Sequence, residues 1–227
     1  MLDEIYEEIE QEVAEYTEKK EKAKNEEGPR GFKMTPEERQ KRINQVEQEL
    51  KEQVNDKMEK YRNKLKRKAK KHKKKVQEFE QADNTEKTYK ATAAGQEIEM
   101  LDKKEIPKHL KNIDDPTKRK EFVRLAQLKL RDEEDTKLQK EFNQSIRQSL
   151  PEEEKEAREN LAYKQQLLEN FDRMQQKANR TVNKIINQGD KFGEAFKQEK
   201  LQNLSHSWGD TNEQIKNNLD KHILKQF

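Results

Sequence analysis

A single apolar stripe from Ile43 to Phe79 constrains the fold more than any other feature of this chain. Its ten steps cover 36 residues, an average spacing of 3.6, at Ile43, Val46, Leu50, Val54, Met58, Tyr61, Leu65, Ala69, His72, Val76 and Phe79. This spacing is the period of an undistorted α-helix, whereas a left-handed coiled coil requires about 3.5. A helix from Pro36 to Glu80 would be roughly 65 Å long at about 1.5 Å per residue. Such a helix needs a second helix to cover its stripe, either in the same chain or in a partner.

Composition argues against a single thick core. Only 29% of the 227 residues are hydrophobic, whereas 43% are charged, and a compact domain of this length is normally about half apolar. The 50 basic and 47 acidic residues nearly cancel, which argues against disorder. The sequence therefore predicts an all-α protein of elongated, long helices with coiled-coil-like packing and little or no β-structure.

The amino-terminal helices are delimited by capping and turn residues. Residues 1–24 predict an acidic helix with a narrow apolar stripe at Leu2, Ile5, Ile9, Val13 and Tyr16. Glycine and proline mark residues 25–34 as a loop. The long helix is expected over 35–81, because Thr35 can cap it, Pro36 suits its first position and Glu38 can complete a capping box.

Residues 82–115 break the helical pattern and predict a connector. A run of small residues at 91–95 and the proline at 107 interrupt any apolar stripe there. We expect a short helix around Met100–Glu105, and a strand pair around Thr88–Met100 is the alternative for part of this stretch.

Residues 116–188 predict two long helices. The first runs from Pro116 to Gln148, with an apolar face at Phe122, Leu125, Leu128, Leu138, Phe142 and Ile146. The second restarts at Ser149, which has capping-box spacing to Glu152, and ends near Gly189. Residues 189–227 predict short carboxyl-terminal helices around a turn that holds Trp208, with Asp210 and Glu213 capping the last helix.

Residues 60–75 carry eleven Lys or Arg and no acidic residue. Basic side chains on a helix can neutralise the phosphates of DNA or RNA without reading the bases. The candidate phosphate contacts are Lys64, Lys66, Arg67, Lys68, Lys70, Lys71, Lys73, Lys74 and Lys75. The alternative is a solvated helix face, or one that pairs with the acidic residues of the 1–18 segment.

No residue pattern predicts catalysis, a cofactor or a metal. The absence of cysteine excludes disulfides, thiolate nucleophiles and iron–sulfur clusters. His72, His109, His206 and His222 are scattered, and no pair has metal-ligand spacing. Thin helices rarely supply the water-excluding pocket that an enzyme needs. We therefore expect no enzyme, and no catalytic, cofactor-binding or metal-binding residues.

The amino terminus and the hydropathy profile bear on localisation. Residues 1–18 are acidic, the reverse of the basic start of a signal peptide. No apolar run approaches the ~20 residues that cross a bilayer. We expect an intracellular (cytoplasmic) or virion-interior protein that is not secreted and does not insert into a membrane.

These patterns together predict a structural, assembly or scaffolding protein that acts through helix–helix contacts, such as a component of a virion or another large complex. The residues expected at the seam with a protein partner or a second copy are Val46, Leu50, Val54, Met58, Tyr61 and Leu65. The alternative is a nucleic-acid-binding accessory protein without sequence specificity that uses the basic segment 60–75. A chain that folds only with its partner is a third hypothesis.

Overall fold

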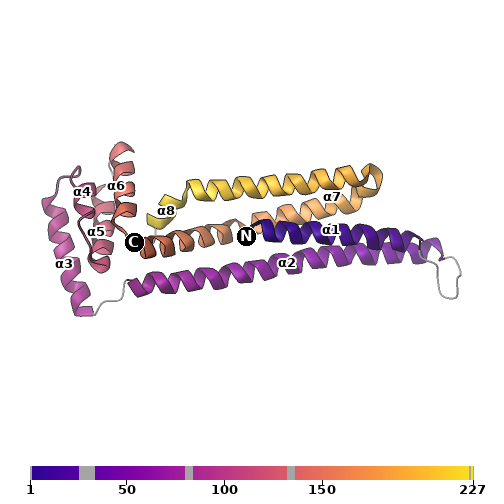
Figure 1. The fold of residues 1–227 in the computed structure, drawn as a ribbon, viewed down its shortest axis with the longest axis horizontal. Helices are drawn as coiled ribbons and strands as arrows, with labels where there is room; N and C mark the ends of the chain where they lie inside the picture. Colours follow the sequence, from indigo (N-terminus) through magenta and orange to yellow (C-terminus); the bar gives the residue numbers. More distant parts are fainter. Residues whose placement is uncertain (1, 26–33, 80–83, 132–135, 225, 227) are drawn as a thin grey trace. The chain divides into compact units, whose positions relative to one another are not determined.

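The computed structural model describes residues 2–25, 34–79, 84–131, 136–224 and 226 (Figure 1). These residues form eight helices and no strand: α1 Leu2–Asn25, α2 Pro36–Phe79, α3 Asn84–Met100, α4 Ile106–Leu110, α5 Pro116–Lys129, α6 Thr136–Ser149, α7 Glu152–Asn217 and α8 Leu219–Leu224. The prediction of an all-α fold with long helices is confirmed, since α2 has 44 residues and α7 has 66. None of the described helices combines the length and the hydropathy needed to cross a membrane.

The chain divides into two compact units. Unit 1 comprises Met1–Lys66 and Gln166–Gln214, and unit 2 comprises Arg67–Gln165 and Ile215–Phe227. Helices α2 and α7 contribute residues to both units.

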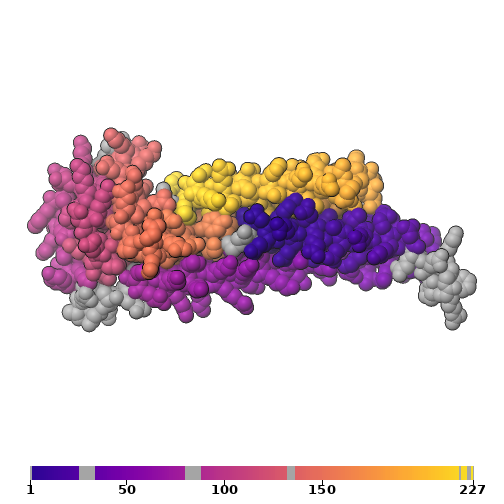
Figure 2. Space-filling view, in the orientation of Figure 1, coloured from indigo at the N-terminus to yellow at the C-terminus, as the bar shows by residue number. Residues whose placement is uncertain are grey.

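In unit 1, α1 and α2 form an antiparallel pair. Glu4, near the start of α1, pairs with Lys64 at 2.9 Å, whereas Lys20, near its end, pairs with Glu47 at 2.8 Å. Contacts that advance along one helix and retreat along the other require opposite directions. Figure 2 shows the indigo surface of α1 lying on the purple surface of α2.

A single glycine folds α7 back on itself. Gly193 has φ 76° and ψ −167°, a conformation that L side chains rarely adopt, and it separates two helical arms. The arms run antiparallel, because Lys177 donates a hydrogen bond to Ser207 and Lys197 lies against Gly189. A Cβ on Gly189 would stand only 3.1 Å from Cε of Lys197, so the glycine lets the arms approach closely. Figure 1 shows the resulting hairpin, in orange and yellow.

The four helical segments of unit 1 form a bundle in which each packs antiparallel to the next. Arg62 of α2 pairs with Asp172 of the first α7 arm at 3.4 Å, and Lys197 of the second arm donates to Thr17 of α1 at 3.1 Å. The interior is apolar and includes Ile9, Val13, Leu50, Val54, Met58, Leu65, Phe171, Ala178 and Trp208. Complete burial of each large apolar side chain stabilises the fold by about 1.5–3 kcal/mol.

Unit 2 is built from shorter helices. Helix α3 packs on α5, and α4 packs on both α5 and α6. Their shared core consists of Ala94, Ile98, Ile106, Leu110, Ile113, Phe122, Val123, Ala126, Leu130, Leu138, Phe142 and Ile146. Asp115 caps α5 by accepting a hydrogen bond from the backbone N–H of Lys118 at 2.8 Å, and Pro116 follows at the first helical position. The helix start predicted there is confirmed.

Both amino-terminal helices agree with the sequence-based prediction. All five residues of the α1 stripe are buried. The capping box of α2 is formed, since the Thr35 N–H donates to the Glu38 carboxylate at 2.9 Å and the Glu38 N–H donates to Thr35 Oγ1 at 3.2 Å. The predicted loop lies mostly outside the described residues, which stop at 25 and resume at 34.

The prediction of a connector over 82–115 was wrong for the residues that the structure describes. Helices α3 and α4 occupy most of that range, and neither the expected helix at Met100–Glu105 nor a strand pair forms. Helix α3 buries only Ala94 and Ile98 among its apolar side chains, so it has almost no stripe of its own. Packing supports it instead: Lys129 of α5 donates to the backbone oxygens of Ile98 and Leu101 at 2.6 Å.

The expected helix from Pro116 to Gln148 is two helices, α5 and α6. Leu130 ends α5 with a non-helical backbone and a buried side chain. Leu128 was expected on the apolar face, but it is 56% exposed. The predicted capping box at Ser149 is also wrong, because this residue ends α6 and its hydroxyl donates back to the Ile146 oxygen at 2.9 Å.

The carboxyl-terminal boundaries differ from the prediction as well. Helix α7 continues through Gly189, and its break lies four residues later at Gly193. Trp208 lies within the second arm and is 1% exposed, so no turn forms there and Asp210 caps no helix. The reason is a stripe across the expected turn, at Leu201, Leu204, Trp208 and Ile215, all of which are buried.

Candidate nucleic-acid interface on helix α2

The predicted seam residues of α2 are all buried within unit 1. Leu50, Val54, Met58 and Leu65 are at most 1% exposed, and Val46 and Tyr61 are at most 7% exposed. Tyr61 stacks on Phe171 of the first α7 arm, with 6.3 Å between ring centroids. The stripe is therefore covered by helices of the same chain.

Two of the four basic residues of the segment that lie in unit 1 pair with acidic residues, whereas Lys60 and Lys66 are exposed. Lys64 contacts Glu4 of α1 at 2.9 Å. Arg62 contacts Asp172 at 3.4 Å, and its guanidinium carbon lies 5.5 Å from the centroid of the Phe171 ring. These contacts follow the acid-paired alternative that the sequence left open.

The part in unit 2 is arranged differently. Seven basic side chains between positions 67 and 75 are exposed: Arg67, Lys68, Lys70, Lys71, Lys73, Lys74 and Lys75. Among the described residues, no carboxylate pairs with any of the five lysines from Lys70 to Lys75. Ala69 and Val76 turn inward, so the cations occupy the outer part of the helix circumference. We call these seven side chains the basic face.

The positive side chains of the basic face repel one another. Positions 67 and 71, 70 and 74, and 71 and 75 place like charges one helical turn apart, and each such pair destabilises a helix by about 0.2–0.5 kcal/mol. A bound polyanion would relieve this repulsion while it gains several favourable contacts.

His72 interrupts the basic face on its inner side. It is half-buried, and its Nδ1 atom is buried without a hydrogen-bond partner among the described residues. Burial lowers the pKa of His72, and the nearby ammonium groups of Lys164, Lys75 and Lys71 lower it further. The imidazole is therefore neutral at pH 7, and the positive charge of the face comes from lysine and arginine alone.

The other histidines do not form a cluster of metal ligands among the described residues. His109 contacts Glu97 at 3.1 Å and stacks on Phe122 at 5.3 Å between ring centroids. Within the described part of the chain, no group of His, Asp and Glu is arranged to hold a metal ion.

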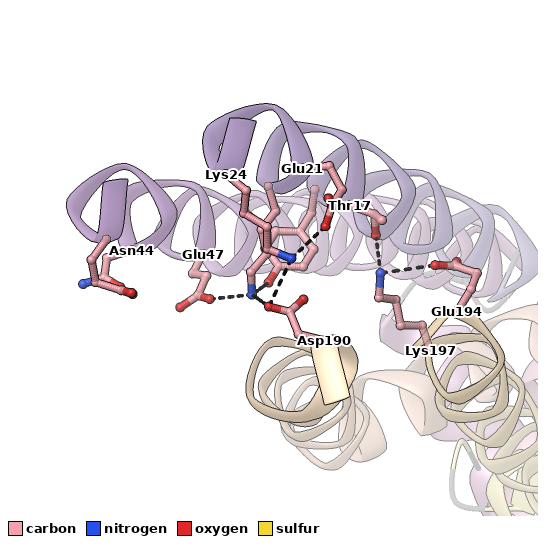
Figure 3. Close-up of polar contacts among 11 residues, drawn as sticks. Thr17, Glu21, Lys24, Asn44, Glu47, Asp190, Glu194 and Lys197 are labelled. Carbon is pink, nitrogen blue, oxygen red and sulfur yellow. Dashed lines mark hydrogen bonds and ion pairs between the residues drawn. The ribbon is translucent and has the colours of Figure 1, made fainter. Parts of the chain in front are cut away.

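A second charged region ties three helices of unit 1 together. The buried ammonium of Lys20 lies 2.8 Å from Glu47 of α2 and 3.3 Å from Asp190 of α7, and Lys24 reaches Asp190 at 3.4 Å (Figure 3). Burial disfavours the charged form of Lys20, but its hydrogen bonds to Glu47 and Tyr16 outweigh this effect and raise its pKa. These charges neutralise one another, so the contacts hold α1, α2 and α7 together. We call Lys20, Lys24, Glu47 and Asp190 the lock.

Unit 2 also contains a buried charge cluster. Glu154 accepts hydrogen bonds from Arg119 at 3.0 Å and from Arg158 at 2.9 Å, and all three residues are at most 1% exposed. Arg119 donates further bonds to the backbone oxygens of Ile113 and Asp114. The cluster joins α5 to α7.

Sequence reasoning missed the buried charged residues, although a signal was present. Lys164 lies between Leu161 and Leu167 at the spacing of an apolar helix face, and Lys20 follows Tyr16 in the same way. A charged residue at a stripe position is expected to be buried and to need a counter-ion.

Comparison with models of known protein families finds no matching family, and comparisons with curated proteins and with solved structures find no significant similarity.

Proposed function

We propose that this chain is a non-enzymatic protein that binds nucleic acid, without reading its sequence, through the basic face of α2. One observation carries the proposal: five neighbouring lysines from Lys70 to Lys75 have no acidic partner among the described residues, whereas Lys64 on the same helix has one. Exposed lysines without an acidic partner contribute most to the free energy of binding when they neutralise phosphates.

The spacing of the cations supports a phosphate partner. Positions 67–75 span about 12 Å of helix at 1.5 Å per residue. Duplex DNA carries one charge per about 1.7 Å of its axis, so several phosphates fall within reach of this face. Binding would be electrostatic and would depend little on base sequence, because no base-reading pattern accompanies the lysines.

The test is the salt dependence of duplex binding. Engagement of five phosphates predicts a slope of log K against log salt of about −4 to −5. Replacement of Lys70, Lys71, Lys73, Lys74 and Lys75 by Gln should abolish most of the binding at ~0.15 M salt. Helicity should persist, because Gln is a helix former comparable to Lys.

A charge-matched control separates the basic face from net charge. Lys104, Lys108, Lys111, Lys137 and Lys140 are partly or fully exposed lysines on other segments of unit 2. Their replacement by Gln removes the same charge and should leave the slope close to that of the wild type. Equal losses in both variants, or no binding by the wild type at ~0.15 M salt, would refute the proposal.

A second candidate function is assembly or scaffolding through helix–helix contacts with a protein partner or a second copy. Three exposed apolar side chains in unit 2 favour it: Tyr89 is 75% exposed and Met100 86% on α3, and Leu128 is 56% exposed on α5. Tyr89 and Met100 are eleven residues apart, about three helical turns, so they share a face. If this face mediates assembly, the variant Tyr89→Ser/Met100→Gln should sediment as a smaller species than the wild type. Identical sedimentation would exclude these residues from assembly.

A further inference from the structure

A cavity of about 720 Å³ lies between the last turns of α1 and the amino-terminal part of α2. The described residues that line it all belong to unit 1, and none of them is part of the basic face. Sites for small molecules typically have volumes of roughly 300–1,000 Å³. The cavity is therefore large enough for a small organic ligand. We call this cavity, which lies between residues 19–25 and 42–49, the α1–α2 groove.

The lining residues follow the helical period on both helices. Lys19, Lys22 and Ala23 of α1 are three and four positions apart, so they share one face of that helix. Arg42 and Val46 of α2 are four positions apart and share a face in the same way. The groove is therefore formed by two facing helix surfaces.

The floor of the groove is apolar and incompletely filled. Ala23 continues the apolar stripe of α1 seven positions after Tyr16, and it is 2% exposed. Val46 of α2 lines the same cavity and is 7% exposed. Because alanine is the smallest side chain of the α1 stripe, the groove stays open at this position. An apolar ligand group can contact this floor.

The α1 side of the groove carries two ammonium groups without a counter-ion. Lys19 and Lys22 pair with no acidic residue among the described residues. Lys20 and Lys24, which lie on the neighbouring face of α1, both contact Asp190 of α7, at 3.3 Å and 3.4 Å (Figure 3). The lysines of this helix end therefore divide into a neutralised pair in the lock and an uncompensated pair at the groove.

The α2 side leaves the groove positive. Arg42 adds a third cation, and its Nη1 donates to Gln45 Oε1 at 3.5 Å. Glu49 is the one carboxylate among the described lining residues, and it accepts a hydrogen bond from Gln45 at 3.2 Å. Three cations and one carboxylate favour an anionic ligand.

We propose that the α1–α2 groove binds a small molecule that combines an apolar body with one anionic group. The apolar body lies on Ala23 and Val46, where it removes apolar surface from water. The anionic group accepts charge-assisted hydrogen bonds from Lys19 and Lys22. The inference goes beyond the proposed function, because nucleic-acid binding by the basic face uses none of these residues.

Fluorescence titration with anilinonaphthalene sulfonate, an apolar dye with one anionic group, tests the groove at ~0.15 M salt. The dye reports contact with apolar surface, and circular dichroism checks that the helices stay intact. The wild type should bind one dye molecule with saturation. Phenylnaphthylamine, which has the same rings without the sulfonate, should bind at least about tenfold more weakly. Inorganic sulfate, which has no apolar body, should not displace the dye at an equal concentration.

Substitutions of charged lining residues should change dye affinity in opposite directions. Lys19→Gln/Lys22→Gln should fold, because neither side chain is fully buried, and should bind the dye about tenfold more weakly. Glu49→Gln removes the carboxylate and should bind the dye about two- to fivefold more tightly. The matched control, Lys60→Gln/Lys184→Gln, removes the same charge at exposed positions of unit 1 outside the groove and should bind as the wild type does.

Several outcomes would overturn the proposal. They are a wild type without saturable dye binding, equal affinity for the two dyes, equal losses in the two lysine double variants, and weaker binding by Glu49→Gln. The five-lysine variant of the basic face separates this site from the proposed function. It should bind the dye as the wild type does, and loss of dye binding in that variant would place the dye on the basic face instead.

Discussion

The two units differ in how their buried charged side chains are neutralised. In unit 1, buried lysines reach carboxylates on neighbouring helices, as Lys20 reaches Glu47. In unit 2, the buried carboxylate of Glu154 is shared by two arginines, and Lys164 has no carboxylate among the described residues. A net charge of only +3 for the whole chain conceals this difference. Local pairing, and not net charge, indicates where an anionic partner can bind.

The largest effect is expected in the apolar interior of unit 1. Val54 and Met58 are both 0% exposed. Replacement of both by Glu buries two unpaired carboxylates and should destabilise the fold by more than about 4 kcal/mol. Circular dichroism during urea unfolding measures this loss. Asn63→Glu/Gln77→Glu adds the same charge at exposed positions of α2 and should change stability little. Similar unfolding curves for the two double variants would contradict a buried seam.

The buried cluster of unit 2 gives the next largest effect. Glu154→Gln leaves Arg119 and Arg158 buried without their carboxylate and should cost about 3–5 kcal/mol. The matched control is Glu4→Gln in unit 1, where the pair with Lys64 is about half exposed, and the cost should be about 0–1 kcal/mol. Chemical denaturation of both variants measures the difference. Equal costs would contradict the burial of the Glu154 cluster, because the exposed pair of Glu4 is screened by solvent.

Two glycine-to-alanine substitutions in α7 should have smaller effects on the free energy of unfolding, and these two effects should have opposite signs. Gly193→Ala places a side chain at φ 76° and should cost about 1–3 kcal/mol, purely from the backbone, because nothing lies within 4 Å of the added Cβ. Gly209 lies within the second arm, also with nothing within 4 Å. Gly209→Ala should therefore stabilise the helix by about 0.5–1 kcal/mol. Melting temperatures that shift in the same direction would place the reversal elsewhere.

The smallest effect is the pH dependence of the lock in unit 1. Burial tends to raise the pKa of Asp190, but Lys20 and Lys24 outweigh it and the pKa lies below its ordinary value of 3.8. A lowered folded-state pKa means that the stabilisation is complete above the unfolded-state value and is lost as the pH falls through the folded-state value. The Asp190 side chain is 47% exposed, so solvent limits the contribution to about 1 kcal/mol or less.

The measurement is the difference in melting temperature between the wild type and Asp190→Asn. It should stay constant from pH 7 to pH 5 and shrink towards zero below about pH 4. Asp56→Asn alters an exposed carboxylate with no ion pair among the described residues and should show no such trend. A difference that grows on acidification would have the wrong sign.

The helices that could be predicted are those with a repeating apolar stripe. Helices α1 and α2 were found with nearly correct ends, because the stripe and the Thr35 capping box depend on local sequence. Helix α3 was missed because its support comes from Lys129, 29 residues beyond its end. The basic segment was identified as a candidate, but only the structure separates its paired part from its exposed part.

The sequence by itself determined the all-α class, the long helix α2 and the face of it that is buried, because helical period and capping act within a few residues. Tertiary structure decided which glycine reverses α7, since Gly189 and Gly193 look alike until Lys197 packs against the first of them. It also decided which charges are neutralised. Ion pairs such as Lys64 with Glu4 join residues 60 positions apart, and the pattern along the chain does not encode which distant side chains meet.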